Sequence, residues 1–211
     1  MRRVPLLLAP RVRPGLIALS LLGAVGALCA PAQAQVLLTQ EEALRLAFPE
    51  PATVERRTAF LEDAQLAEVN RLAAPAAAST RTVVSYYVGL DGDAPIGVAW
   101  FDAHRVRTLQ EVLMVVVDPA GFVSHIEVLG FAEPPEYMAP GGWLELFSGR
   151  RLERGTSTRG DIPIITGATL TAHATSAAVR RSLALQQVID PLNDTGSERV
   201  AGDASELDGR P

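Results

Sequence analysis

The stretch between residues 81 and 131 is the part of this chain that most constrains its fold. Four segments rich in Val, Ile, Thr and aromatic residues follow one another there, with turn residues between them: 81–88, 96–101, 108–117 and 122–131. Such closely spaced strands favour antiparallel pairing, because parallel neighbours need long crossover connections. We therefore expect an antiparallel β-meander.

Two details of this stretch refine the prediction. The sequence Asp118-Pro119-Ala120-Gly121 is typical of a hairpin turn, since Pro presets one backbone dihedral and Gly supplies the unusual one. The run 115–117 is continuously apolar, which indicates a strand that is covered on both faces. Helices are the natural cover, so we expect an α+β fold with helices packed against the sheet.

Three helices are predicted from capping and periodicity. Thr39 and Glu42 have the spacing of a capping box, and Pro49 and Pro51 end the helix that follows. A second helix is expected over about 62–72, before the Ala/Pro-rich connector 73–78. A third is expected over 172–188.

The two ends of the chain differ in composition from the middle. Residues 1–34 contain several arginines, then an apolar run at 16–30, then Ala32-Gln33-Ala34. This order is typical of a secretory signal peptide, and an uncleaved membrane anchor is the alternative. The tail 194–211 is polar and is predicted to be disordered. The expected organisation is thus a signal peptide (1–34), an N-terminal helical segment (35–78), a main domain (79–193) and the tail.

Composition excludes several classes of function. The single cysteine, Cys29, falls within the expected signal, so the exported chain lacks thiolate metal sites and cysteine nucleophiles. All nineteen basic residues are arginine and four of them precede residue 35, which leaves fifteen against twenty-four acidic residues, a net charge of −9. Nucleic acid is not an expected partner, because a polyanion needs a basic footprint.

The hexapeptide Thr166-Gly167-Ala168-Thr169-Leu170-Thr171 is the strongest candidate for a functional site. A short strand expected at 162–165 leads into it, and Thr171 is placed to cap the following helix. Slim residues let a ligand approach the backbone, three hydroxyls gather nearby, and a helix N-terminus favours phosphate. On spacing alone, a purely structural turn with an N-cap explains the same residues and is favoured.

This hexapeptide resembles the Ser/Thr-Gly-Ala-Thr-x-Thr/Ser flavinylation motif of the FMN-binding domain family. That family includes the FMN-carrying subunits of the Rnf electron-transport complex and of the sodium-translocating NADH:quinone oxidoreductase. The resemblance extends over 86–131, the loop 133–143 and the helix to residue 188. It implies that Thr169 carries FMN through a phosphoester bond, installed outside the cytoplasm by a flavin transferase. Thr166, Gly167, Ala168, Leu170 and Thr171 would shape the attachment turn.

One departure from the family pattern concerns the residue that opens the motif. The family usually has an Asp two residues before the Ser/Thr, whereas four residues separate Asp161 from Thr166 here. Non-covalent FMN therefore stays open as an alternative. The transferase would supply the base and metal that a weak alcohol nucleophile needs, so no catalytic residue is expected in this chain.

The function implied by the resemblance is that of an exported, periplasmic electron-transfer flavoprotein, either membrane-associated or free beside the membrane, with membrane-associated redox partners. A flavin-dependent reductase module acting on a small molecule is a second hypothesis. A non-redox binding or assembly module is the third.

Other polar residues are weaker candidates. Near His104, the side chain of Arg107 can bind a phosphate or form an ion pair with Glu111, and the ion pair with Glu111 is the favoured interpretation. His125 and Glu127 share one face of a strand, more typical of its wetter side than of a metal site.

Residues near the motif were also considered as cofactor contacts. His173 follows Thr171 closely, but an exposed helical histidine is the favoured interpretation. Tyr137, Trp143 and Phe147 in the loop-like stretch 132–155 can shield a flavin ring, but packing is favoured. Neither a transition-metal site nor a hydrolase has support in this sequence.

Overall fold

The computed structural model describes residues 35–74, 77–193 and 198–199. The predicted signal segment, 1–34, and the predicted tail, 194–211, lie outside the described residues, apart from Glu198 and Arg199. Within the described part of the chain, no helix combines the length and apolar character needed to cross a lipid bilayer.

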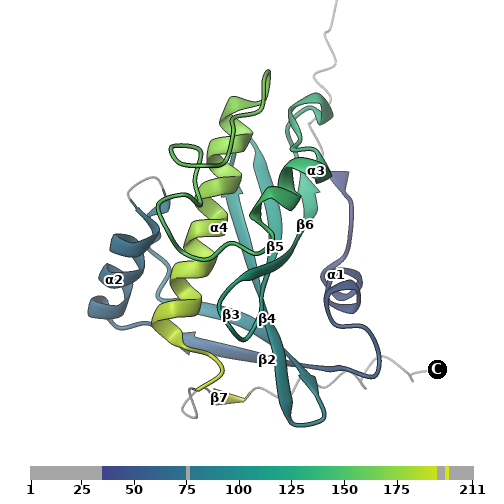
Figure 1. Ribbon diagram of the computed structural model, residues 1–211, viewed down its shortest axis with the longest axis vertical. Coiled ribbons are helices and arrows are strands. Elements are labelled where there is room, and N and C mark those ends of the chain that lie inside the picture. Colours follow the sequence, from purple (N-terminus) through teal and green to yellow (C-terminus); the bar gives the residue numbers. More distant parts are fainter. Residues whose placement is uncertain (1–34, 75–76, 194–197, 200–211) are drawn as a thin grey trace, which may run out of the picture. The chain divides into compact units, whose positions relative to one another are not determined.

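The core of the protein is one antiparallel sheet, with strands in the order β1-β6-β5-β4-β3-β2-β7. Strands β3 to β6 are neighbours in sequence and in space (Figure 1), which confirms the predicted meander and the α+β class. The strands are β1 (Gln35–Val36), β2 (Thr53–Phe60), β3 (Val83–Asp91), β4 (Ala94–Arg105), β5 (Gln110–Val117), β6 (Val123–Phe131) and β7 (Glu198–Arg199).

Strand β2 was not predicted from the sequence. It pairs with β3 along its whole length, from Thr53 opposite Leu90 to Phe60 opposite Val83. Of its residues only Ala59 is buried, so the strand lacks the regular apolar alternation that marks a half-buried strand. Pairing with an existing sheet edge, rather than local sequence, places it there.

The short strand expected at 162–165 is absent, and this prediction was wrong. Ile162 is buried in the core, but Ile164 is 54% exposed and no ladder forms along the segment. Pro163 lies in the middle and has no N–H to donate to a neighbouring strand, so the segment enters the motif as an irregular connection.

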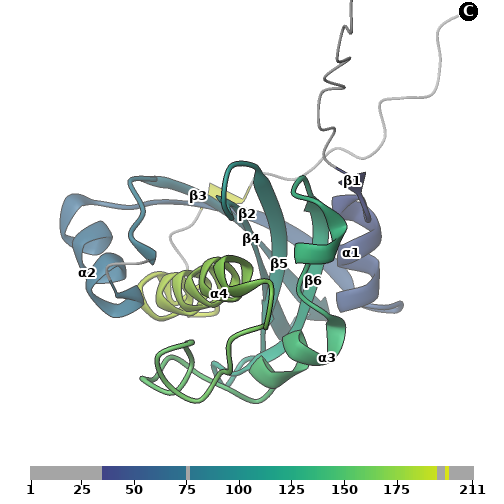
Figure 2. The same ribbon diagram turned by 90° about the horizontal axis from the view of Figure 1, so that it is seen from above.

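Helices cover both faces of the sheet (Figure 2). Helix α4 contacts β4, β5 and α2 on one face, and α1 contacts β6 on the other. Val115 and Val117 face the α4 side while Val116 packs with α1, which confirms that β5 is covered twice. The helices are α1 (Gln40–Ala47), α2 (Asp63–Ala73), α3 (Gly141–Leu144) and α4 (Thr169–Ile189), with 3₁₀ turns η2 (Pro135–Tyr137) and η3 (Glu145–Phe147).

The predicted local signals at α1 and at the β5–β6 turn are confirmed. The Thr39 N–H donates to Glu42 Oε2 at 2.8 Å and the Glu42 N–H donates to Thr39 Oγ1 at 3.2 Å, which completes the capping box. At the turn, Asp118 Oδ1 accepts hydrogen bonds from two backbone N–H groups, and Gly121 has a φ of 85°.

Phe48, directly after α1, fixes that helix on the sheet. Its ring covers Gly89 so closely that a Cβ there would lie 2.5 Å from Phe48 Cε1, and it also approaches Gly97. The Phe48 side chain is 4% exposed. The glycines thus form the hollow into which the ring fits.

We predict that Phe48→Ala lowers the free energy of unfolding by about 3–5 kcal/mol, because it removes a buried ring and leaves a cavity. Phe60 in β2 is 65% exposed, and Phe60→Ala should cost less than about 0.5 kcal/mol. Urea unfolding of the two variants measures both. Equal losses would contradict the packing of α1 through Phe48.

Candidate functional site

The hexapeptide lies where the loop after η3 enters α4, and the helix begins earlier than predicted. It begins at Thr169, with Ala168 at the N-cap position and no side-chain cap. The prediction that Thr171 is the N-cap was wrong, because Thr171 lies within the first turn. It is buried, and its Oγ1 donates to the carbonyl of Tyr137 at 2.6 Å. Gly167, at a φ of 85°, provides the bend before the helix.

The first turn of α4 presents free backbone donors. The Ala172 N–H bonds the Ala168 carbonyl at 3.0 Å, whereas the N–H groups of Thr169, Leu170 and Thr171 have no hydrogen-bond partner within the described residues. A long helix concentrates partial positive charge at such donors. The start of α4 is therefore chemically suited to an anion.

A cavity of about 200 Å³ adjoins these donors. It brings five of the six motif residues together, but Thr166 is not among those that line it. The three hydroxyls of the motif do not converge as expected, since Thr171 points to Tyr137 while Thr166 and Thr169 are exposed. The lining residues are Val106, Arg107, Glu133, Tyr137, Gly167, Ala168, Thr169, Leu170 and Thr171.

Glu133 holds the opposite wall of this cavity in place. Its Oε1 accepts from the N–H groups of Arg107, Thr108 and Leu109 at 3.2, 2.6 and 2.8 Å, and from Thr108 Oγ1 at 3.2 Å. The backbone hydrogen bonds from Leu109 and Thr108 lower the pKa of Glu133 below its usual value. The loop sequence gave no signal for this role, which fixes Arg107 at the cavity edge.

The predicted ion pair between Arg107 and Glu111 was wrong. Arg107 lies in the turn between β4 and β5, is exposed and lines the cavity, with no carboxylate partner in the described chain. Glu111 is fully buried on β5 and contacts His104 and Thr175 instead. The turn separates the two side chains, so Arg107 stays available to an anion.

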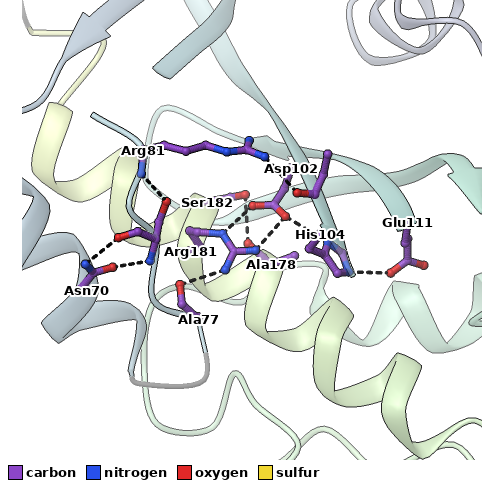
Figure 3. A network of polar contacts seen from close by, with 11 residues as sticks. Asn70, Ala77, Arg81, Asp102, His104, Glu111, Ala178, Arg181 and Ser182 are labelled. Carbon is purple, nitrogen blue, oxygen red and sulfur yellow. Dashed lines mark hydrogen bonds and ion pairs between the residues drawn. The ribbon is translucent and has the colours of Figure 1, made fainter. Parts of the chain in front are cut away.

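A buried polar network joins the sheet to α4 (Figure 3). His104 Nδ1 lies 3.0 Å from Asp102 Oδ1, and His104 Nε2 lies 2.9 Å from Glu111 Oε2. From α4, Arg181 Nε and Nη2 donate to the two oxygens of Asp102 at 2.6 and 2.8 Å. Thr175 Oγ1 donates to Glu111 at 2.9 Å.

His104 and Glu111 of this network were candidates from the sequence, whereas Asp102, Thr175 and Arg181 were not. Asp102 and His104 are two residues apart within a strand, so they share one face. Two ionisable side chains on one face of a largely buried strand were the signal that could have found them.

The network favours a charged histidine. Burial by itself lowers the pKa of His104, but the hydrogen bonds to Asp102 and Glu111 outweigh it and raise that pKa above its usual value. Burial also raises the pKa of Asp102, yet the bonds from His104 and Arg181 bring it down to about 2. Since both ring nitrogens of His104 are occupied, the histidine is not available as a general base.

The remaining candidates have structural contacts. Trp143 and Phe147 are buried edge to face with centroids 5.3 Å apart, which confirms packing, while Tyr137 lines the motif cavity. His173 Nδ1 lies 2.6 Å from Thr158 Oγ1 and does not line that cavity.

His125 and Glu127 contact each other at 2.9 Å on β6, opposite Val116 and Met114 of β5. The described residues contain no group of three or more His, Cys, Asp or Glu side chains arranged to hold a metal ion.

Comparisons with protein-family models, with curated proteins and with solved structures give no match for this chain.

We predict that His104→Gln destabilises the protein by about 3–5 kcal/mol at pH 6, because it breaks a buried charge network. His104 has a raised pKa in the folded state, so its contribution is complete below its unfolded pKa of about 6.5 and is lost as pH rises through the folded value. The difference between wild type and variant should therefore shrink at pH 9.

Urea unfolding at both pH values measures this difference. His125→Gln, which removes a half-exposed pair with Glu127, is the matched control and should change stability little at either pH. An equal loss at pH 6 and pH 9 for His104→Gln would contradict a charged histidine in the network.

Proposed function

We propose that this protein is an exported electron-transfer flavoprotein that carries FMN on Thr169 through a phosphoester bond. The observation that supports it most is the position of the Thr169 hydroxyl. It is exposed in the first turn of α4, beside free backbone N–H groups and next to a cavity that Arg107 lines. The motif resemblance and this local geometry point to the same residue.

The phosphate end of FMN fits the chemistry of the site. Backbone donors at the start of a long helix favour an anion by about 0.3–1 kcal/mol per contact. Arg107 adds a full positive charge and makes no ion pair within the described chain, although the Glu133 carboxylate also lines this cavity. Glu133, which fixes the backbone of Arg107, gives this cation a defined place.

The cavity is large enough to cover part of the flavin ring of FMN. Pockets that enclose drug-sized ligands measure roughly 300–1,000 Å³, and this cavity of about 200 Å³ is smaller. Val106, Tyr137 and Leu170 supply an apolar lining for part of a planar group. The remainder would stay at the surface, which suits electron exchange with a docked partner.

The chain's own residues would bind and orient the cofactor. Bound FMN supplies transfer of one or two electrons. Thr169 supplies the oxygen of the phosphoester, and a tether of this kind keeps the cofactor at high effective concentration outside the cell. Attachment would use FAD as the donor: the Thr169 oxygen would bond to the FMN phosphorus, the pyrophosphate bond of FAD would break and AMP would leave, with the flavin transferase supplying the base and metal. The proposed redox partners are membrane-associated.

Asp161 bears on whether the attachment is covalent. It is exposed in the loop before the motif, and its Oδ2 lies 3.3 Å from Nη1 of Arg150. Because it lies further from Thr166 than the family's opening Asp, the covalent and non-covalent forms need separate experiments.

For the covalent form, we predict that the full chain, coexpressed with a flavin transferase, gains flavin fluorescence and the FMN mass increment after denaturation. Thr169→Val should abolish both, because the acceptor oxygen is gone. Thr169→Ser should retain labelling, and Thr166→Val, at an exposed hydroxyl that does not line the cavity, should not remove it. Label that persists in Thr169→Val would contradict the assignment of the acceptor.

For the non-covalent form, we predict that flavin-free Thr169→Val protein binds FMN and that adding Arg107→Gln weakens this binding about tenfold or more, the value of one charge-assisted hydrogen bond. Arg105→Gln removes an exposed charge that does not line the cavity and should leave the affinity unchanged. Titration of FMN fluorescence measures both. Equal weakening by the two substitutions would indicate general electrostatics only.

A further inference from the structure

A second, larger cavity of about 720 Å³ lies beside α4. It is bounded by the end of α2, by one face of α4 and by the loop 153–160 that precedes the motif. Figure 2 shows α2 and α4 side by side on one face of the sheet. We refer to it as the arginine cavity, after Arg154, Arg159 and Arg180 in its wall.

The arginine cavity is strongly cationic in an acidic protein. Its wall contains three arginines and His173, and none of the described residues that line it is Asp or Glu. The whole sequence has a net charge of −5. Asp161, which directly follows the loop 153–160, forms an ion pair with Arg150 and not with an arginine of the cavity. No ion pair in the described chain involves a cavity arginine, although Glu153 directly precedes Arg154 in the same loop.

The three arginines of the cavity differ in their contacts. The guanidinium of Arg180 donates to the carbonyls of Leu72, Ala73 and Glu153, at 2.9, 3.0 and 2.5 Å, and so ties α2 and the loop to α4. Arg154 and Arg159 are exposed and make no ion pair in the described chain. The guanidinium groups of Arg154 and Arg159 are therefore free to bind a ligand.

The loop that presents them is held tightly. Gly155 and Gly160 pack backbone to backbone, so a Cβ on Gly160 would lie 2.7 Å from Gly155 Cα. Thr156 is fully buried and its Oγ1 donates to the Arg151 carbonyl at 2.6 Å. A fixed backbone lowers the entropy cost of ordering side chains around a ligand.

Hydroxyl and imidazole groups add hydrogen-bonding capacity to the same wall. Thr158 and His173 contact each other at 2.6 Å between the loop and α4. Ser176 is buried in the cavity wall, and its Oγ has no hydrogen-bond partner in the described structure. This oxygen is enclosed and does not face the open cavity, so the hydrogen-bonding groups that a ligand can reach are those of Thr158 and His173.

We infer that the arginine cavity binds the phosphate group of a small anionic molecule. Two free guanidiniums suit phosphate, which they bind through charge-assisted and bidentate hydrogen bonds. The volume of about 720 Å³ lies within the range of roughly 300–1,000 Å³ that encloses small ligands. This inference uses none of the residues on which FMN attachment depends.

Calorimetric titration of the flavin-free full chain with inorganic pyrophosphate tests the inference. We expect saturable binding that Arg154→Gln plus Arg159→Gln weakens about tenfold or more, since each substitution removes a charge-assisted contact. Both side chains are exposed, so the urea midpoint should not change. The control Arg105→Gln, a single exposed arginine on β4 outside the cavity, should retain wild-type affinity.

The same variants separate a soluble phosphate from a lipid headgroup. Vesicles that contain phosphatidylglycerol replace pyrophosphate in a sedimentation assay. Binding of either probe that depends on Arg154 and Arg159 supports the inference and identifies the source of the phosphate. No saturable binding of either probe, or binding that the double substitution leaves unchanged, would overturn it.

The outcome is independent of the flavin proposal. Thr169→Val and Arg107→Gln should leave pyrophosphate affinity unchanged, because neither residue lines the arginine cavity. If either of them abolished binding, the phosphate would lie at the start of α4 and the second site would be refuted. Flavin attachment, in turn, should survive the double substitution of Arg154 and Arg159.

Discussion

The position of α4 depends on the polar contacts that Arg181 and Thr175 make with Asp102 and Glu111 of the sheet, which His104 bridges. Most of the helix face toward the sheet consists of small residues, which allow a close approach but bury little apolar area per residue. Arg181 reaches Asp102, and Thr175 reaches Glu111, at two levels of the helix. A buried network of this kind adds little net stability but makes other arrangements costly, because each leaves a buried charge unpaired. It therefore sets the register of α4 on the sheet.

That register decides where the motif lies, since the motif is the first turn of the same helix. Two further contacts complete the arrangement there: Thr171 bonds the Tyr137 carbonyl, and Glu133 binds the backbone of the β4–β5 turn. Three separate parts of the chain thus meet at one small cavity, each held by a polar contact rather than by apolar packing alone. Such preorganisation lowers the cost of fixing a ligand.

Local signals predicted much of the fold, and contacts distant in sequence account for what was missed. The capping box of Thr39, the turn at Gly121 and the apolar run 115–117 each act within a few residues, and the structure agrees with them. Strand β2 depends on the edge of β3, and the true start of α4 depends on a carbonyl 34 residues away from Thr171. The hexapeptide was visible in the sequence, and Arg107 was weighed there as a phosphate contact, but the role of Glu133 in the cavity wall was not visible, because nothing local brings it to the motif.

Helical spacing relates the two cavities. Thr169, His173, Ser176 and Arg180 recur at intervals of three or four residues, so they lie along one side of α4. An anion attached at Thr169 and a second one in the arginine cavity would therefore share one helix face and the positive field of its N-terminus. Like charges in such positions repel, and the coupling is reciprocal, so occupation of one site weakens the other by the same factor. FMN bound covalently at Thr169 would stay in place, so we expect the repulsion to appear as a lower affinity of the arginine cavity for its anion in the flavinylated protein than in the flavin-free protein.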